Sequence, residues 1–412
     1  MKKGNFKKKI SAALLSLVLG VGALSSIPNG MLQVEASDNE TVETQDTLNV
    51  ALYEYVPDVE RFEAAVEEKW AAVHPDISLN FVSWDSYDSD PADSLDVFVF
   101  DALFLSHFVE EGYLTPLGIS QVQNANDILP FALDGCTVDG NIYAIPQIVC
   151  TNLLYSRKND SGMAGVDTVD KLYNVIGNCT STGVVPNDNE GLLIDMSGGT
   201  TKVCMYLDAL IDVNQTYTDY YNLPDVNDLN STALANLALL QSMAGKEQAS
   251  YWPDNNDSYI RALWFKEGHG RAYIGYTEAM CSMGDFANDV DFRTISLANN
   301  PDIPLFYGDV VGVNSAITDQ NKKELAIELA NIVASADTTI AAISPDENNL
   351  YPQYLLPARL SVYEYMQDDY PIYGKLEVIA TNPNNKLFKV GPNVRSWIAA
   401  AKPVISAYLN NH

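Results

Sequence analysis

One stretch of this 412-residue chain combines an interrupted apolar run with a thiol that could act as a nucleophile. It runs from Tyr143 to Tyr155, with Pro146 inside the run and Cys150 near its centre. Because proline has no N–H to donate to a sheet ladder, we do not expect a uniform central strand here. We expect the chain to leave one sheet and enter another. Cys150 would then lie at a cleft between two lobes, where ligands usually bind.

Three carboxylates are expected at the same cleft. Asp101 ends an apolar strand-like run, Asp309 interrupts another, and Glu278 follows a third. Ligand sites of α/β proteins lie at the carboxyl ends of strands, and an unpaired charge buried beside apolar runs would be costly. These positions are therefore candidates for function. The tyrosines expected to face the cleft with them are Tyr53, Tyr55, Tyr276 and Tyr307.

A cysteine nucleophile needs a base, because only a few per cent of a free thiol is ionised at neutral pH. Glu278 could serve if burial raises its pKa towards neutrality. A Cys–His pair would have to recruit His107 or His269, and His107 lies in a helical stretch where packing is the more common role. Tyrosine rings and carboxylates together would also suit a flat heteroaromatic cation.

Each of these residues also has an ordinary structural interpretation. Cys150 could be an inert buried thiol, and Glu278 a solvated or loop-capping acid. The tyrosines could be half-buried core residues. The residues alone leave both interpretations open.

Strands alternate with helices along the chain, which indicates an α/β fold. Residues 48–56 and 77–82 read as strands on either side of an amphipathic helix over 61–73, which predicts a parallel βαβ unit. The glycine-rich loop 197–201 could cradle an anion at a helix N-terminus. It lacks the lysine and hydroxyl order of a nucleotide loop, so we expect packing and capping there.

The order of the pieces predicts two lobes built from non-contiguous segments. We expect chain crossings near 148–152, 306–312 and 346–356. The predicted lobes are 47–147 with about 311–347, and 148–310 with about 348–412. This arrangement resembles the type II fold of bacterial periplasmic solute-binding proteins, with a central cleft and hinge crossings.

The N-terminus reads as a secretory signal peptide. Five lysines precede an apolar run of about 15 residues and a small-residue exit at Ala36, which predicts cleavage near that residue. A membrane span needs roughly 20 apolar residues, so we expect no stable membrane insertion. No cysteine precedes Cys136, which excludes a lipid-modified cysteine at the cleavage site. Residues 37–46 are expected to be a disordered lead-in to a secreted protein.

The chain is strongly acidic, with a net charge of −30. Removing residues 1–36, which hold five lysines and Glu35, leaves 19 basic and 53 acidic residues and a charge of −34. Such a surface repels nucleic acid, attracts cationic ligands and mildly favours a monomer.

Metal and disulfide chemistry find little support in the sequence. The four histidines and five cysteines form no CxxC, HExxH or clustered ligand pattern, so no metal is expected. Four of the cysteines could pair in three ways and leave one thiol free, and the sequence does not choose among them. The five are Cys136, Cys150, Cys179, Cys204 and Cys281.

Seven blocks of sequence carry a resemblance to one family. They are VALYEYVPD (50–58), FVSWDSY (81–87), DVFVFD (96–101) with LSHF (105–108), PQIVCTN (146–152), GGTTK (198–202), IGYTE (274–278) and PLFYGDVV (304–311). In this order, from about residue 48 to Trp397, the chain resembles bacterial thiaminase I, also called thiamine pyridinylase.

The resemblance implies a secreted transferase with the bilobed solute-binding fold, which degrades thiamine without a metal or organic cofactor. Cys150 would attack the pyrimidine ring of thiamine, with Glu278 as general base. The thiazole leaves, and an amine, pyridine or thiol co-substrate replaces it in a base exchange. Asp101 and Asp309 would bind the aminopyrimidine or balance the cation. By the same resemblance, the cleft would be lined by Tyr53, Tyr55, Tyr87, Tyr259, Tyr276 and Tyr307.

A binding protein is the alternative. An extracytoplasmic receptor that captures thiamine without catalysis could have the same fold, tyrosines and carboxylates. It would have no use for a reactive thiol at Cys150. The absence of a lipid-anchor cysteine also counts against it.

Overall fold

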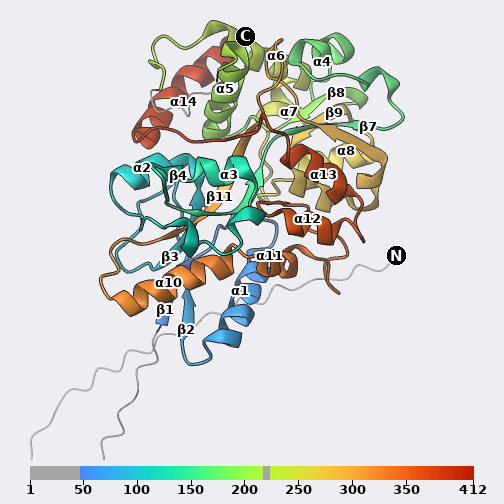
Figure 1. The fold of residues 1–412 in the computed structure, drawn as a ribbon. Coiled ribbons are helices and arrows are strands. Elements are labelled where there is room, and N and C mark those ends of the chain that lie inside the picture. Colours follow the sequence, from blue (N-terminus) through green and yellow to red (C-terminus); the bar gives the residue numbers. More distant parts are fainter. Residues whose placement is uncertain (1–46, 217–222) are drawn as a thin grey trace, which may run out of the picture. The chain divides into compact units, whose positions relative to one another are not determined.

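The computed structural model describes residues 47–216 and 223–412, in which helices pack on two main β-sheets (Figure 1). The predicted signal peptide (1–36) and lead-in (37–46) lie outside the described residues. Strands alternate with helices along the described chain, so the predicted α/β class is confirmed.

The larger sheet has seven strands, in the order β12-β6-β11-β3-β1-β2 with β13 beside β11. Their bounds are β1 (Thr47–Ala51), β2 (Ser78–Phe81), β3 (Val97–Asp101), β6 (Ile145–Cys150), β11 (Leu305–Val313), β12 (Leu356–Pro357) and β13 (Lys386–Leu387). β1 is parallel to β2 and β3, whereas β11 is antiparallel to β3 and β6. The predicted βαβ unit is confirmed: α1 (Val59–Val73) joins β1 to β2 and begins at Asp58, whose carboxylate accepts a hydrogen bond from the Arg61 N–H.

The smaller sheet has four strands, in the order β10-β7-β9-β8. They are β7 (Leu153–Arg157), β8 (Asp188–Ile194), β9 (Gly270–Gly275) and β10 (Val290–Arg293). Because β8 and β9 are parallel, their carboxyl ends meet at one edge of the sheet. That edge delivers Asp195 after β8, and Tyr276 with Glu278 after β9.

The chain leaves the larger sheet at Cys150 and enters the smaller one at Leu153, as the Pro146 interruption predicted. Pro146 belongs to β6, but it lies where the pairing with β11 shifts register: Asp309 faces Ile148 and Val310 faces Pro146, so Gln147 bulges out. On the other side of β6, β12 pairs only with Ile148 and Val149. The missing N–H of Pro146 therefore removes no hydrogen bond from the β6–β12 pairing.

A second crossing runs from β10 back to β11. The two crossings touch, because the Thr151 hydroxyl donates a 2.9 Å hydrogen bond to the Leu305 carbonyl.

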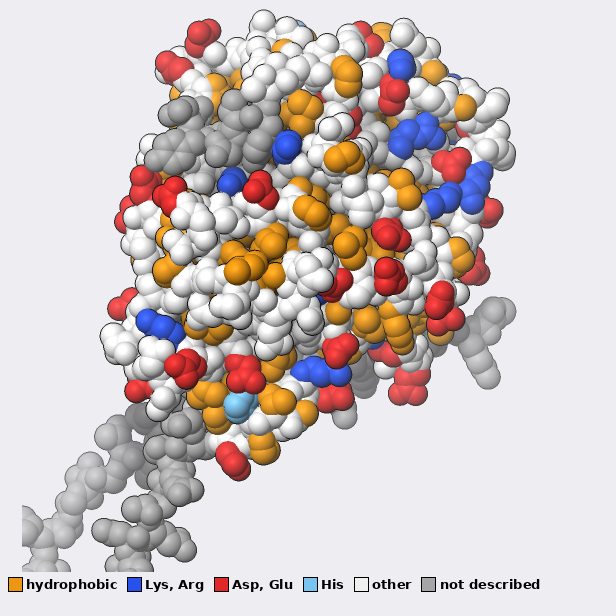
Figure 2. All heavy atoms as spheres, viewed as in Figure 1, with side chains coloured by type: hydrophobic (Ala, Val, Ile, Leu, Met, Phe, Trp, Pro, Cys, Tyr) orange, Lys and Arg blue, Asp and Glu red, His pale blue; other side chains and the backbone are white. Residues whose placement is uncertain are grey.

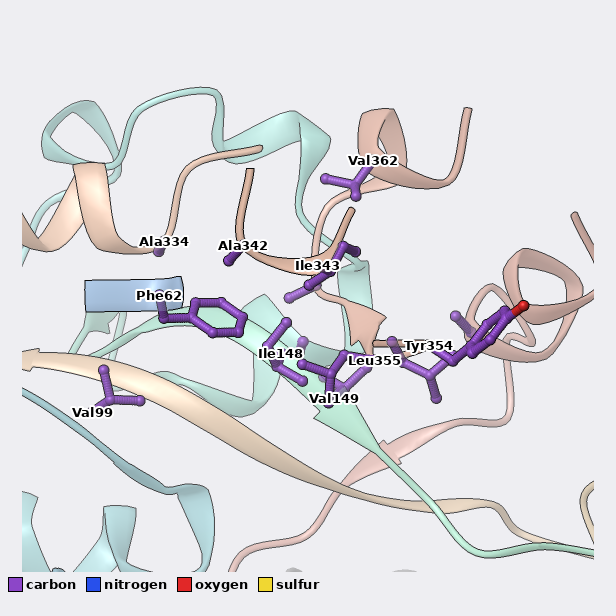
Figure 3. Packing of buried hydrophobic residues seen from close by; sticks show 14 of the residues in the cluster. Phe62, Val99, Ile148, Val149, Ala334, Ala342, Ile343, Tyr354, Leu355 and Val362 are labelled. Atoms are coloured by element: carbon purple, nitrogen blue, oxygen red, sulfur yellow. The ribbon is translucent and has the colours of Figure 1, made fainter. Parts of the chain in front are cut away.

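Two buried apolar clusters lie on opposite faces of the larger sheet. Val97 and Val99 of β3 pack in one cluster, and Phe98 and Phe100 in the other, as expected of a strand buried on both faces. The first cluster lies under α1, α10 (Gln320–Val333) and α11 (Ala336–Ile343), where Figure 3 shows Phe62, Ile148 and Ile343 together.

Helices also cover the smaller sheet. α5 (Gly199–Asn214) packs against α6 (Ser231–Ala244) and α14 (Val394–Asn411), while α8 (Ile260–Glu267) packs on β8 and β9. The other helices are α2 (Leu105–Glu110), α3 (Pro130–Gly135), α4 (Val169–Ile176), α7 (Lys246–Ser250), α9 (Met280–Met283), α12 (Leu360–Met366) and α13 (Ile372–Ala380). β4 (Thr137–Val138) and β5 (Asn141–Ile142) form a small hairpin.

Of the helices in the described residues, none is by itself long and apolar enough to span a membrane, and only the bent pair α10–α11 satisfies that test on length and composition.

The lobe boundaries drawn from the sequence remain a prediction. From the segment 348–412, the structure places the two-residue strands β12 and β13 in the larger sheet and α14 against α5 and α6. Strands of two residues are too short to show a periodic pattern.

The bulge at Gln147 generates a testable prediction. Its Nε2 donates a 3.1 Å hydrogen bond to the carbonyl of Val333 at the end of α10. Gln147→Ala leaves that buried carbonyl without its partner and should lower the free energy of unfolding by roughly 1–3 kcal/mol in urea titrations. Gln123→Ala is the control, because Gln123 is exposed and its change should stay within about 0.5 kcal/mol. Equal effects of the two substitutions would contradict the prediction.

Candidate active site

A cavity of about 560 Å³ lies where the ends of β3, β6, β9 and β11 meet. All ten residues predicted from the sequence line it: Tyr53, Tyr55, Tyr87, Asp101, Cys150, Tyr259, Tyr276, Glu278, Tyr307 and Asp309. Both crossings contribute, since Cys150 ends β6 and Tyr307 lies opposite it in β11. The fold thus gathers positions that are up to 256 residues apart in the sequence.

Two of the carboxylates face each other across strands. Asp101 pairs with Asp309 in the β3–β11 ladder, and both are buried. The carboxylate of Asp101 accepts a 2.9 Å hydrogen bond from the Leu103 N–H and a 2.7 Å bond from the Tyr87 hydroxyl. Burial still raises the pKa of Asp101 to about 6. Burial and the charges of Asp101 and Glu278 raise the pKa of Asp309 well above its usual value, so the two acids disfavour simultaneous ionisation.

Glu278 lies in the one-turn 3₁₀ helix η5 (Thr277–Ala279), directly after β9. Its side chain is buried, and within the described chain its Oε2 has no hydrogen-bond partner. Burial raises the pKa of Glu278 to about 7. A carboxylate with this pKa and a free oxygen is suited to accept a proton near neutral pH.

Cys150 is a protonated thiol in this environment. Burial, followed by the charges of Asp309 and Glu278, raises its pKa well above the usual value. Within the described residues, Asp101, Glu278 and Asp309 form no ion pair with Lys, Arg or His. A positive charge that entered the cavity would therefore favour ionisation of both the thiol and the acids.

The tyrosines line the cavity in two groups. Tyr53 and Tyr55 have ring centroids 5.3 Å apart, and Tyr55 and Tyr87 are 6.4 Å apart, each pair edge to face. Tyr276 and Tyr307 form another edge-to-face pair at 6.0 Å. Aromatic faces beside buried carboxylates attract flat cations, as the sequence reasoning anticipated.

Neither histidine considered as a base for Cys150 lines this cavity. His107 Nε2 lies 2.9 Å from Asp90 Oδ1, and His269 Nδ1 lies 3.2 Å from Asp188 Oδ1. The Cys–His alternative is therefore wrong. The question left open about disulfides is also answered, because all five cysteines are free thiols.

Several cavity residues were not singled out from the sequence. Arg261 of α8 is fully buried, donates to the carbonyls of Gln248 and Tyr251, and lies 3.6 Å from Asp195. The sequence pattern predicts that Arg261 lies in a helix, but it does not indicate that the side chain faces a cavity. The other cavity residues that were missed include Cys204, Trp252 and Asp257, with Thr200 and Thr201 from the loop expected to cap a helix.

Comparison with known proteins identifies the relatives of this chain. A model of the thiaminase-1 domain matches residues 151–298. Thiaminase-1 of Paenibacillus thiaminolyticus is 51% identical over 359 residues, which cover 87% of each chain. The chain belongs to the thiaminase I family. The enzyme class implied by the resemblance is thereby confirmed.

Solved structures agree with the family and the fold. Clostridium botulinum thiaminase I in complex with thiamin is 61% identical, with a TM-score of 0.87, and the match covers 88% of this chain and 100% of that one. Maltose-bound T. maritima MalE3 is only 16% identical but has a TM-score of 0.63 over 89% of this chain and 98% of its own. That likeness confirms the two-lobed solute-binding fold predicted for this thiaminase I sequence.

The raised pKa of Glu278 predicts a pH-dependent cost of folding. An unfolded glutamate ionises near pH 4.5, whereas folded Glu278 stays protonated up to about pH 7. The free energy of unfolding should therefore fall by about 3 kcal/mol from this residue as the pH rises from 4.5 to above 7. Glu278→Gln removes this contribution, so the variant should gain stability over the parent across that interval. Urea titrations at several pH values test this, and a constant difference would contradict it.

Proposed function

We propose that this chain cleaves thiamine and transfers its pyrimidine portion to a second nucleophile, with Cys150 as the covalent catalyst. The observation that carries the proposal is one cavity lined by tyrosines that holds Cys150, Glu278 and the opposed Asp101–Asp309 pair. The Oε2 of Glu278 has no hydrogen-bond partner among the described residues. Membership of the thiaminase I family supports it.

Thiamine matches the two kinds of side chain that line this cavity, carboxylates and tyrosines. Its aminopyrimidine offers ring nitrogens and an amino group that suit the buried pair Asp101 and Asp309, one of which can stay protonated while the other accepts. Its thiazolium ring is a flat cation, which suits the tyrosine faces. The positive charge also compensates the carboxylates, so substrate binding lowers the pKa of the Cys150 thiol from its raised value.

The first half-reaction forms a covalent intermediate. Glu278 takes the thiol proton, and the Cys150 sulfur bonds to a carbon of the pyrimidine ring. The bond between the methylene carbon and the thiazolium nitrogen then breaks. Its electron pair goes to that nitrogen, so the thiazole leaves as a neutral molecule and the pyrimidine stays on the enzyme with an exocyclic methylene.

The second half-reaction regenerates the enzyme. An amine, pyridine or thiol bonds to the methylene carbon, and the bond between the ring and sulfur breaks. The thiolate of Cys150 takes back the proton that Glu278 holds. Where the co-substrate is an amine or a thiol that carries a proton, the Glu278 carboxylate then accepts that proton. Water-excluding burial of Glu278 keeps that proton exchange within the site.

The setting of this reaction is part of the proposal. The lysine-rich, apolar N-terminus supports secretion after cleavage near Ala36. Acidic side chains are spread over the face drawn in Figure 2, which suits capture of a cation by a monomer that needs no nucleic acid or membrane partner.

Replacement of the nucleophile gives the most direct test. Cys150→Ser should lower turnover of thiamine with an amine acceptor by at least about 1,000-fold while thiamine still binds, because serine is a far weaker nucleophile. Mass spectrometry of the parent incubated with thiamine alone should detect the pyrimidine adduct on Cys150. Cys179→Ser is the control, since Cys179 lies outside the cavity.

Two results would contradict the proposal. Turnover by Cys150→Ser at the parental rate would reject the nucleophile. Unmodified protein that binds thiamine and leaves it intact would favour the alternative, a thiamine-binding receptor.

The assignment of Glu278 predicts a pH profile. The base must be ionised and its pKa is about 7, so kcat/KM should fall about tenfold per pH unit below that pH. Glu278→Gln should lose roughly 100- to 10,000-fold in kcat and lack this acidic limb. An unchanged limb in the variant would show that another group is the base.

A further inference from the structure

Asp85 connects two of the cavity tyrosines although it does not line the main cavity itself. Its Oδ2 accepts a 2.6 Å hydrogen bond from the Tyr55 hydroxyl. Its Oδ1 accepts a 2.8 Å bond from the backbone N–H of Tyr87. The two carboxylate oxygens thus hold one ring by its hydroxyl and the other by its main chain.

Tyr55 needs such a restraint because the residue is 60% exposed. Its contacts with other rings are edge to face, at 5.3 Å from Tyr53 and 6.4 Å from Tyr87. An exposed ring with two such contacts would otherwise sample several rotamers. The bond to Asp85, followed by burial, raises the pKa of Tyr55 above its usual value.

Tyr87 extends the connection into the interior. Its hydroxyl donates to Asp101, so a continuous path runs from exposed Tyr55 through Asp85 and Tyr87 to a buried carboxylate. Tyr53, Tyr55 and Tyr87 also line a neighbouring cavity of about 570 Å³, which includes Asp85. These tyrosines therefore border both cavities, and Asp85, which lines the neighbouring cavity, bonds to two of them.

We propose that Asp85 is a positioning residue that holds Tyr55 as a platform for the cationic ring of the substrate. A phenol that donates to a carboxylate is more electron-rich, which strengthens the attraction of its face for a cation. The buried acids receive the pyrimidine and Tyr55 lies at the exposed end of the cavity, so the thiazolium ring would lie against Tyr55. This inference rests on the proposed function and adds a determinant of selectivity for charged substrates.

The test compares a cation with a neutral isostere. Calorimetry in the Cys150→Ser background measures the dissociation constants of thiamine and of an analogue in which carbon replaces the charged ring nitrogen. Asp85→Asn should weaken thiamine binding by roughly 3- to 30-fold more than binding of the analogue. The preference for the cation is the ratio of the dissociation constant of the analogue to that of thiamine. In a Tyr55→Phe background, Asp85→Asn should lower this ratio by less than half of the factor seen with Tyr55 present.

Asp88→Asn is the matched control. Asp88 lies three residues further on, carries the same charge and also lines the neighbouring cavity. Its side chain is exposed and has no hydrogen bond or ion pair to the described residues. The preference for thiamine over the analogue should therefore stay within twofold of the parent.

Four results would overturn the inference. Equal weakening of both ligands in Asp85→Asn would mean that Asp85 only supports the local fold. An equal loss of preference in Asp88→Asn, or a loss undiminished by Tyr55→Phe, would assign the effect to long-range charge. Failure of the Cys150→Ser parent to bind thiamine would contradict the proposed function itself, and this inference with it.

Discussion

The pairing of β11 with strands on both sides sets the positions on which the site depends. Its antiparallel register with β3 places Asp309 opposite Asp101, and its register with β6 places Tyr307 opposite Cys150. Backbone hydrogen bonds in the centre of a buried sheet are the most rigid support a protein offers, so the thiol and two carboxylates are fixed before any ligand arrives. Tyr307 belongs to this frame, and the other cavity tyrosines lie around it.

The same arrangement concentrates negative charge on three buried carboxylates. In the described residues, the carboxylates of Asp101, Glu278 and Asp309 have no basic ion-pair partner. Burial of such groups raises their pKa values and costs folding energy. A cationic ligand bound beside these carboxylates would recover part of that cost. Enzymes commonly retain such destabilising sites for activity.

The sequence predicted the site better than it predicted the boundaries of the fold. Asp101 and Asp309 were identifiable because an unpaired charge that ends or interrupts an apolar strand is costly to bury. Glu278 was identifiable because it follows a strand, whereas Tyr87 and Tyr259 came only from the family resemblance. Arg261 and Cys204 were missed because a helix position carries no sign that it faces a cavity rather than a core. The short strands β12 and β13 exist only through tertiary pairing, which a local pattern cannot show.

The bulge at Gln147 also has an evolutionary consequence. Side chains alternate between the two faces of a strand, so a shift by one residue exchanges the face of every side chain beyond it. Loss of the one extra residue would change which side of β6 carries the thiol, or else displace Pro146 from the place where a missing N–H does no harm. A deletion or insertion of a single codon in β6 would therefore change whether the Cys150 thiol faces the cavity.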